Sequence, residues 1–370
     1  MMTVSRKELL RVLKVLSGPK NLMITDSEYI LVKPFGDRVT MHRNCMDWAV
    51  SDVCDVTYQN IRPFMIPYRQ LRNYILSDVI GDGVEIRSLD TFQIEVLFEK
   101  SSKKMTCKKG VVSFVSGSRM DLDEASIRVD VLKDILETHI RTLPTGFASV
   151  SDGVFVSIQD GMIEAFATDQ SNITHTSMCD SSNATSDLHF GIPKKIVPRL
   201  LSFLKNARLR RDQVLYVADS GYSVRFRTFD NHFVSMTKNL KRPRVGPVIA
   251  MKMERSFAII SRSLWSSLRK TVILGDVTQG LMVHVEIIDN QPVVSIENRD
   301  SSIFRIVPFV AVEGVEGDVR VSIPLHHLLH FLTGVKDERV LFEFGDSDRD
   351  PCRLSYDNRS RVLMCAGKPK

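Results

Sequence analysis

Apolar residues recur at three- and four-residue steps directly after three prolines, each of which follows an isoleucine: Pro67, Pro193 and Pro324. This pattern predicts a helix after each proline, because proline has a helical φ and its missing amide hydrogen would have no partner in a first turn. The prolines stand 126 and then 131 residues apart. Three such helices at nearly constant spacing indicate a repeated domain.

A second set of predicted helix starts has almost the same spacing. Ser5, Asp130 and Ser261 each precede a run of helical periodicity, 125 and then 131 residues apart, and all three are residue types that cap helix N-termini. Ser5 and Glu8 also have the spacing of a capping box. Residues that close a short β run repeat with the same two offsets: Asn44, Asp169 and Asp300.

The sequence therefore predicts an α+β protein of three repeated domains, each with two helices and a majority of strands in antiparallel sheets. The domains are expected at residues 1–124, 125–250 (with a connector at 238–250) and 251–370. The expected helices include 5–17, 130–143, 261–273 and 325–334. Gly36-Asp37 is typical of a hairpin turn between two strands, and the lysines between residues 103 and 109 are expected in a turn.

Composition describes an ordinary globular protein. The chain has 370 residues, 43% of them apolar and 25% charged, and no apolar run approaches the roughly 20 residues that span a bilayer. The N-terminus lacks the apolar core of a signal peptide. Six cysteines occur without a CxxC pair, which argues against a disulfide scaffold or a zinc site. We expect a cytoplasmic protein without membrane contact.

The motifs of common catalytic sites do not occur in this sequence. It contains no GxGxxG, no GxxxxGK[ST] and no GxSxG. His326 and His330 have the spacing of metal ligands on a helix, but no glutamate follows His326 as it would in HExxH. A helix surface that carries histidines explains them, so we expect no catalytic residue, metal or cofactor. A metal-dependent enzyme using these two histidines is the rival hypothesis.

Basic residues recur on the predicted helices and beside them. The net charge of +6 permits nucleic-acid binding, and equivalent helices that pack side by side would add their charges into one positive surface. Such a surface neutralises phosphates without reading bases, so the expected partner is double-stranded DNA, bound without sequence preference. A solvated helix surface is the alternative for each stripe taken alone. The candidate DNA-binding residues are Lys7, Arg11, Lys14, Arg69, Arg72, Lys133, Lys194, Lys195, Arg199, Lys205, Arg208, Arg210 and Arg211.

Several short segments resemble one known family. They are Leu16-Ser17-Gly18-Pro19 after the first helix, Asp152-Gly153-Val154-Phe155, Ala167-Thr168-Asp169, Ile192-Pro193-Lys194-Lys195 and Val362-Leu363-Met364. Together with the threefold repeat, they resemble the bacterial DNA polymerase sliding clamp, the β subunit of the replicative polymerase, over the whole chain. The resemblance implies a non-enzymatic processivity factor, a head-to-tail homodimer that closes a ring around duplex DNA. It places Phe114 of one subunit against Ile273 and Leu274 of the next.

The resemblance also implies a cleft for short peptides of DNA polymerase, clamp loader and other partners. Two departures from the family pattern fall in this cleft: residues 170–173 replace the usual Gly-His-Arg-Leu, and residues 364–370 replace the usual C-terminal ending. They suggest a divergent clamp, hypothetically encoded by a phage or mobile element. A clamp-fold interaction module or decoy that does not encircle DNA is the alternative function. The expected cleft residues are Thr168, Gln170, Ser171, Asn172, Ile173, Val248, Ile249, Pro324, His327, Val362, Leu363, Met364, Cys365 and Ala366.

Overall fold

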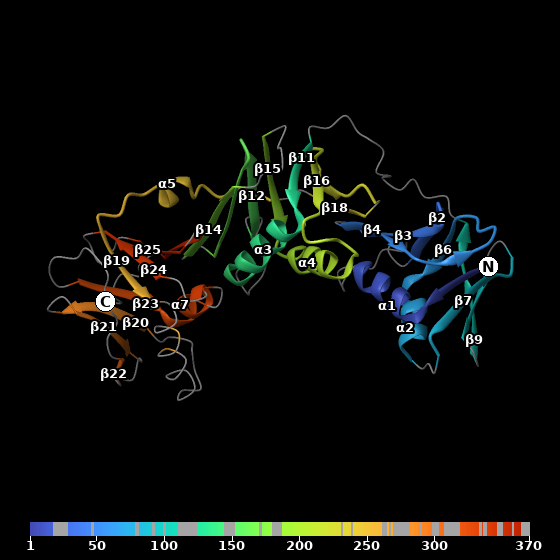
Figure 1. Cartoon of the computed structure of the whole chain (residues 1–370), viewed down its shortest axis with the longest axis horizontal. Helices are drawn as coiled ribbons and strands as arrows, with labels where there is room; N and C mark the ends of the chain where they lie inside the picture. Colours follow the sequence, from blue (N-terminus) through green and yellow to red (C-terminus); the bar gives the residue numbers. More distant parts are fainter. Residues whose placement is uncertain are drawn as a thin grey trace. The chain divides into compact units, whose positions relative to one another are not determined.

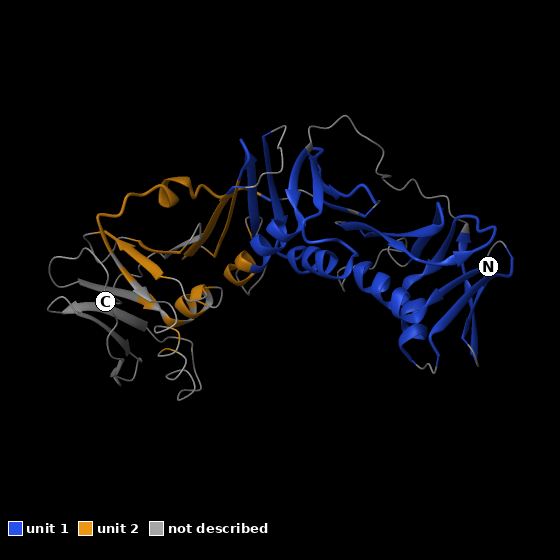
Figure 2. Cartoon of the chain, viewed as in Figure 1, with its two compact units in different colours: residues 1–137, 153–162, 179–240 blue, residues 138–152, 163–178, 241–370 orange. Residues whose placement is uncertain are grey.

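The chain divides into two compact units, each described by itself below (Figure 2). Unit 1 comprises Met1–Glu137, Gly153–Met162 and Cys179–Leu240, and unit 2 comprises Thr138–Asp152, Ile163–Met178 and Lys241–Lys370. The computed structural model describes residues 1–17, 29–45, 48–77, 81–90, 93–98, 101–109, 124–143, 152–169, 172–179, 187–230, 232–237, 240–260, 265, 268, 282–288, 291–297, 303–306, 319–332, 335, 339–345, 351–356 and 359–363.

One order of elements occurs twice in full along the described chain, and its later part occurs a third time (Figure 1). A strand leads into a helix, further strands follow, and a strand that ends in proline precedes the second helix. The first series is β1 (Met2–Ser5), α1 (Arg6–Val15), β2 (Tyr29–Phe35), β3 (Arg38–Cys45), β4 (Trp48–Cys54), β5 (Thr57–Tyr58), β6 (Phe64–Pro67), α2 (Tyr68–Ser77), β7 (Gly83–Ser88), β8 (Gln93–Phe98), β9 (Ser101–Thr106) and β10 (Lys108–Lys109).

The second series follows the same order. The third follows it from β20 onward, and between β19 and β20 only residues 265 and 268 are described, both helical. The second is β11 (Glu124–Arg128), α3 (Val129–His139) with a 3-10 turn (Ile140–Thr142), β12 (Gly153–Gln159), β13 (Met162–Thr168), β14 (Asn172–Cys179), β15 (Leu188–Pro193), α4 (Val197–Asn206), β16 (Val214–Asp219), β17 (Ser223–Arg227), β18 (Phe233–Thr237) and the short α5 (Gly246–Ile249). The third is β19 (Arg255–Ile260), β20 (Met282–Ile288), β21 (Gln291–Glu297), β22 (Ile303–Ile306), β23 (Val319–Pro324), α7 (Leu325–Leu332), β24 (Arg339–Phe344), β25 (Cys352–Tyr356) and β26 (Arg359–Leu363). Among the described residues, no helix is long and apolar enough to cross a membrane.

Unit 1 contains two antiparallel sheets that fix its helices in place. The smaller has the strand order β5-β1-β7-β8-β9, and the larger has the order β10-β6-β2-β3-β4-β18-β17-β16-β11. β4 pairs with β18, with Ser51 opposite Phe233, so one sheet is shared by the first two of the repeated series. Helix α1 packs against both α2 and α4 in this unit, and the three follow one another beside the sheets (Figure 1). β15 and β12 pair with each other in the same unit.

Unit 2 is built from the same kind of antiparallel sheet. β13, β14, β26, β25, β24 and β19 are hydrogen-bonded in that order, and a separate sheet has the order β22-β21-β20-β23. Helix α7 lies against β23, and the Phe331 ring of α7 packs edge-on against Tyr356 of β25, with centroids 5.2 Å apart.

The structure confirms several local predictions. The N–H of Glu8 donates to Ser5 Oγ at 3.2 Å, which makes Ser5 the N-cap of α1, and Leu9 and Leu13 are buried as expected. Phe35 pairs with Arg38, so residues 36–37 form the hairpin turn, and the φ of +59° at Gly36 is the left-handed conformation that glycine favours.

The helices predicted after the three prolines are present: α2 and α7 begin directly after Pro67 and Pro324, and α4 begins four residues after Pro193. Each proline ends a strand, because a proline φ fits either state.

Two other local predictions are wrong in position. Asp130 lies within α3, one residue after its start, instead of at the cap. Lys103 and Lys104 lie on the edge strand β9 rather than in a turn, and exposed lysines on an edge strand hinder pairing with another chain. The residues expected to form helix 261–273 lie almost wholly outside the described residues.

Candidate nucleic-acid interface

Four of the predicted DNA-binding residues are exposed cations on α1 and α2. Lys7 and Lys14 lie on the exposed face of α1, and Arg69 and Arg72 lie on that of α2. Apart from Glu8, the buried faces of the same helices are apolar, which explains why these four charged side chains point outward. Within the described part of the chain, none of the four forms an ion pair with a carboxylate. Their charge is therefore available to an external anion.

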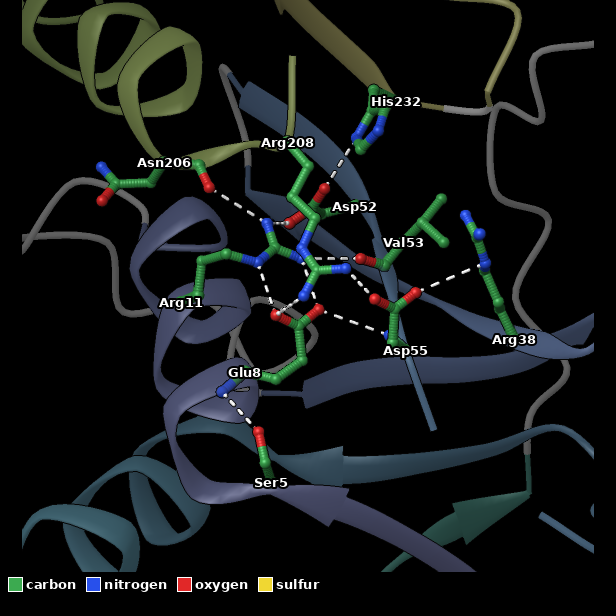
Figure 3. Close-up of polar contacts among 10 residues, drawn as sticks. All are labelled: Ser5, Glu8, Arg11, Arg38, Asp52, Val53, Asp55, Asn206, Arg208 and His232. Atoms are coloured by element: carbon green, nitrogen blue, oxygen red, sulfur yellow. Dashed lines mark hydrogen bonds and ion pairs between the residues drawn. The ribbon is translucent and has the colours of Figure 1, made fainter. Parts of the chain in front are cut away.

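Arg11, in contrast, is used inside unit 1 (Figure 3). Its guanidinium makes two 2.8 Å hydrogen bonds to the carboxylate of Glu8 and one of 2.7 Å to Asp52. It also donates to the backbone oxygens of Val53 and Asn206, at 2.7 and 3.0 Å. Burial alone would lower the pKa of Arg11, but the hydrogen bonds and charges of Glu8 and Asp52 outweigh it and raise the pKa above its ordinary value.

Arg208 belongs to the same ionic cluster. It pairs with Glu8 at 3.0 Å and also with Asp55, and Asp55 in turn lies 3.3 Å from Arg38. On the other side of Arg11, His232 Nδ1 lies 2.7 Å from the fully buried Asp52. We call this set, Glu8, Arg11, Arg38, Asp52, Asp55, Arg208 and His232, the α1 ionic cluster.

The α1 ionic cluster changes the role expected for Arg11 and Arg208, which the sequence predicted to bind DNA. Its three arginines face three carboxylates, so Arg11 and Arg208 add little net charge to the surface. The cluster instead ties α1 to the segment that follows α4. Glu8 does not complete a capping box in the described contacts, because its carboxylate binds Arg11 and Arg208.

The remaining predicted DNA-binding residues lie on or beside α3 and α4. Lys205 of α4 pairs with Glu137 at 2.8 Å, with both side chains about half exposed. Arg199, in the first turn of α4, is half-buried. The others are spread over three segments: Lys133 on α3, Lys194 and Lys195 in the turn before α4, and Arg210 and Arg211 in the turn before β16.

One residue that the sequence reading missed is Arg43 on β3. Its side chain is 7% exposed, its guanidinium lies 3.8 Å from the Tyr68 ring centroid, and it donates to Leu16 O at 2.9 Å. The sequence does contain a pattern that indicates its burial. Alternate residues of β3 point inward, and Arg43 occupies an inward position between the buried Met41 and Cys45. An arginine at such a position is either paired inside the protein or functional.

The expected peptide cleft falls on unit 2, where the structure brings part of it together. Ile173 on β14 is opposite Val362 on β26, and Val362 is opposite Arg353 on β25. Arg353 donates to the backbone oxygens of Ile249 and Met251, at 2.7 Å each, and so holds α5 beside these strands. Three separate segments of the predicted cleft thus meet at one end of the sheet.

The remaining predicted cleft residues lie at other positions of β14, β26 and α5, on β13 or α7, or outside what the structure describes. Asn172 is fully buried, and both its backbone N–H and its side chain bind the carboxylate of Asp169, so it joins the start of β14 to the residue that follows β13. Leu363 is opposite Asn172, Thr168 ends β13, Val248 lies on α5, and His327 is buried on α7. The predictions for Gln170, Ser171, Met364, Cys365, Ala366, Phe114, Ile273 and Leu274, and for the side chain of Pro324, fall outside what the structure describes.

The two histidines of the rival metal site lie outside the described side chains. Within the described residues, no group of three or more His, Cys, Asp or Glu side chains is placed to hold a metal ion. The side chains of His326 and His330 lie outside that part of the structure.

The whole chain matches solved structures of one class. The chain has 11% identity and a TM-score of 0.84 to the DNA polymerase sliding clamp of Bacillus subtilis, covering 100% of this chain and 99% of that one. The sliding clamp of Pseudomonas aeruginosa bound to griselimycin has 15% sequence identity to this chain and a TM-score of 0.83. The β subunit of Streptococcus pyogenes has 15% identity and a TM-score of 0.82. Each match covers 99% of both chains. No family model and no curated protein sequence matches the chain.

These matches identify the fold. The chain has an α+β, DNA-clamp architecture over its full length, as the sequence predicted. More narrowly, it is the fold of the DNA polymerase III β subunit, the bacterial sliding clamp.

Proposed function

We propose that this chain is a sliding clamp, a processivity factor without enzymatic activity that closes around duplex DNA as a head-to-tail homodimer. The observation that supports this most strongly is the full-length clamp fold together with exposed cations on its helices. Such a role at replicating DNA implies a cytoplasmic protein.

The charge distribution of unit 1 suits a sliding duplex. Lys7 and Lys14 are long, exposed side chains that can follow phosphates without a fixed geometry. Contacts of this kind depend on counterion release and carry no sequence information. Weak, exchangeable contacts favour movement along DNA, whereas the topological closure of a ring would prevent dissociation.

We further propose that the end of the unit 2 sheet near Ile173, Val362 and Ile249 takes short peptides of DNA polymerase, the clamp loader and other partners. The meeting of β14, β26 and α5 supports this site. Val248→Asp should abolish binding of a polymerase-derived peptide without changing the oligomeric state. Leu341→Asp, at a comparably apolar but exposed position on β24, is the matched control. Equal peptide affinity in both variants would refute the cleft.

Two measurements test the clamp itself. Light scattering over a dilution series should give twice the chain mass of 41.9 kDa. The protein, once loaded, should remain on closed circular DNA and be lost when that DNA is linearised. A persistent monomer that is not retained on circles would contradict the clamp and favour an interaction module.

A further inference from the structure

Two strongly exposed aromatic side chains lie at the two ends of β17 in unit 1. Tyr222, in the turn before the strand, is 86% exposed, and Phe229, in the turn after it, is 78% exposed. The Phe229 ring packs edge-on against Tyr216 of β16, with centroids 4.8 Å apart. Among the described contacts, Phe229 thus extends an aromatic surface, whereas the Tyr222 ring stands alone.

The turn that carries Phe229 is anchored on both sides of it. The N–H of Thr228 donates to His232 O at 3.0 Å, and the N–H of His232 donates to Thr228 Oγ1 at 3.3 Å. Both residues are buried, and His232 Nδ1 lies 2.7 Å from Asp52 in the α1 ionic cluster (Figure 3). The backbone beside Phe229 is therefore held from inside the protein, and it does not have to be ordered when a partner binds.

Arg227 extends the same surface. It is opposite Tyr216 in the β16–β17 pair, and its guanidinium lies 5.2 Å from the Tyr216 ring centroid, which is the distance of a cation–π contact. Tyr216 and Arg227 occupy outward positions of their strands, because they alternate with the buried Leu215, Val217 and Phe226. A guanidinium beside a ring still has N–H groups that can bind a carboxylate.

A second turn brings positive charge beside Phe229. Gln213 links the two turns, because its Oε1 accepts from the N–H of Arg210 at 3.1 Å and its Nε2 donates to Asp230 Oδ2 at 3.2 Å. Arg210 and Arg211 are exposed, and neither forms an ion pair within the described chain. The two turns, 210–213 and 228–232, and the outward side of β17 together carry four arginines and two aspartates: Arg210, Arg211, Arg225, Arg227, Asp212 and Asp230. This excess of positive charge favours an acidic partner.

We propose that a docking surface for an acidic protein segment is formed by Arg210, Arg211, Tyr216, Arg227 and Phe229. We call it the Phe229 surface. An aromatic or large apolar side chain of the partner packs on the rings of Phe229 and Tyr216, and carboxylates on either side of it pair with the arginines. Aromatic and arginine side chains carry most of the binding energy at many protein interfaces. The surface belongs to unit 1, whereas the proposed peptide cleft falls on unit 2.

Single-stranded nucleic acid is the competing ligand, because bases also stack on aromatic rings. A groove for a strand provides a series of rings for successive bases, but Phe229 is the single strongly exposed ring here, since Tyr216 is half-buried. A strand also carries a phosphate at every nucleotide, and Asp212 and Asp230 would repel some of them. A protein segment can place uncharged residues beside these aspartates, so the geometry favours a protein partner.

Fluorescence anisotropy of the full chain with the labelled heptapeptide Asp-Glu-Asp-Trp-Asp-Glu-Asp at low salt tests the aromatic half. Phe229→Ala should weaken binding about tenfold or more, because it removes the main apolar contact and leaves every charge in place. Tyr222→Ala, which removes a similarly exposed ring at the other end of β17, should leave the affinity unchanged. No saturable binding by the wild type, or equal affinities of the two variants, would overturn the proposal.

Arg227→Gln tests the charged half with the same peptide. It should weaken binding several-fold, and Arg62→Gln, at an exposed arginine of unit 1 outside the Phe229 surface, should not. Equal losses in these two variants would show that the peptide responds only to the total charge of the protein, and would overturn the proposal.

Two further measurements exclude the alternatives. The Tm of Phe229→Ala should lie within about 2 °C of the wild type, and a larger decrease would show that the ring serves the fold and would overturn the proposal. A labelled oligothymidylate in the same assay should bind Phe229→Ala as well as it binds the wild type. Tighter binding than that of the peptide, lost in Phe229→Ala, would assign the surface to single-stranded nucleic acid instead.

Discussion

Glu8 and Arg208 are 200 residues apart in the sequence and 3.0 Å apart in unit 1. Glu8 lies in the first turn of α1, and Arg208 follows α4, so the pair joins the first helix of one repeated series to the second helix of the next. Arg11 shares the Glu8 carboxylate and extends the connection to Asp52 and to Asn206 O. A residue predicted to face DNA is thus part of the joint between two repeats.

Removal of one carboxylate from this joint should be costly. Asp52→Asn leaves Arg11 without its fully buried partner, and should lower the free energy of unfolding by about 2–3 kcal/mol, less than for a wholly buried pair because Arg11 is partly exposed. Urea denaturation measures this loss. Asp37→Asn is the control, since Asp37 is 93% exposed and 3.9 Å from Arg38, and should change stability by less than about 0.5 kcal/mol. Equal losses of unfolding free energy in the two variants would mean that the α1 ionic cluster does not stabilise the contact between α1 and the segment after α4.

The exposed lysines of α1 should contribute to DNA affinity in a way that Arg11 does not. Lys7→Gln/Lys14→Gln should leave the fold intact and reduce the slope of log affinity against log salt by about 2, one for each lost phosphate contact. Fluorescence anisotropy with a linear duplex over a salt series measures the slope. Arg11→Gln should instead lower the stability with little change in slope, and a larger change in slope than that of the lysine variant would contradict the assignment of Arg11 to the cluster.

His42 should make the protein sensitive to mild acid. Burial, with a smaller contribution from Lys33, lowers the pKa of His42 to about 4, whereas an unfolded histidine titrates near about 6.5. Between these two values the unfolded chain binds a proton that the folded chain does not. Stability is therefore lost as the pH falls from about 6.5 to about 4, by about 2–3 kcal/mol in all.

His42→Gln tests this pH dependence, because glutamine can bond to Thr40 Oγ1, which His42 Nε2 contacts at 2.9 Å, without titrating. The difference between the urea midpoints at pH 7 and pH 4.5 should be smaller for the variant than for the wild type. An unchanged pH dependence in the variant would assign the acid sensitivity to other groups.

Gly153 should not tolerate a side chain. It begins β12, and a Cβ added there would lie 2.6 Å from Ile192 O and 2.5 Å from a methyl carbon of Leu240. The methyl can move, but the backbone oxygen belongs to the β12–β15 pair, so Gly153→Ala should cost about 1–3 kcal/mol. Calorimetry measures the loss. Gly83→Ala, where no atom lies within 4 Å of the added Cβ, should be nearly neutral, and a similar cost at both positions would contradict this account.

Much of the fold could be predicted because its signals are local. Helix α1 follows from Ser5 and from the spacing of Leu9 and Leu13, and the hairpin at Gly36 follows from a two-residue turn. The recurring order of strands and helices follows from the same short patterns, repeated at nearly constant offsets. The helices predicted after Pro67 and Pro324 begin directly after these prolines, whereas α4 begins four residues after Pro193.

What the sequence determined by itself is the repeated α+β architecture and the presence of basic helices. Which cations remain available could not be read from it, because Lys7 and Arg11 look alike in a helical stripe. The tertiary structure decided that Arg11 pairs with Asp52 and Glu8, while Arg43, inside a strand, is held by the Tyr68 ring and Leu16 O. Charge is a property of a residue, but its neutralisation depends on partners within a few ångströms, and those partners come from segments far apart in the chain.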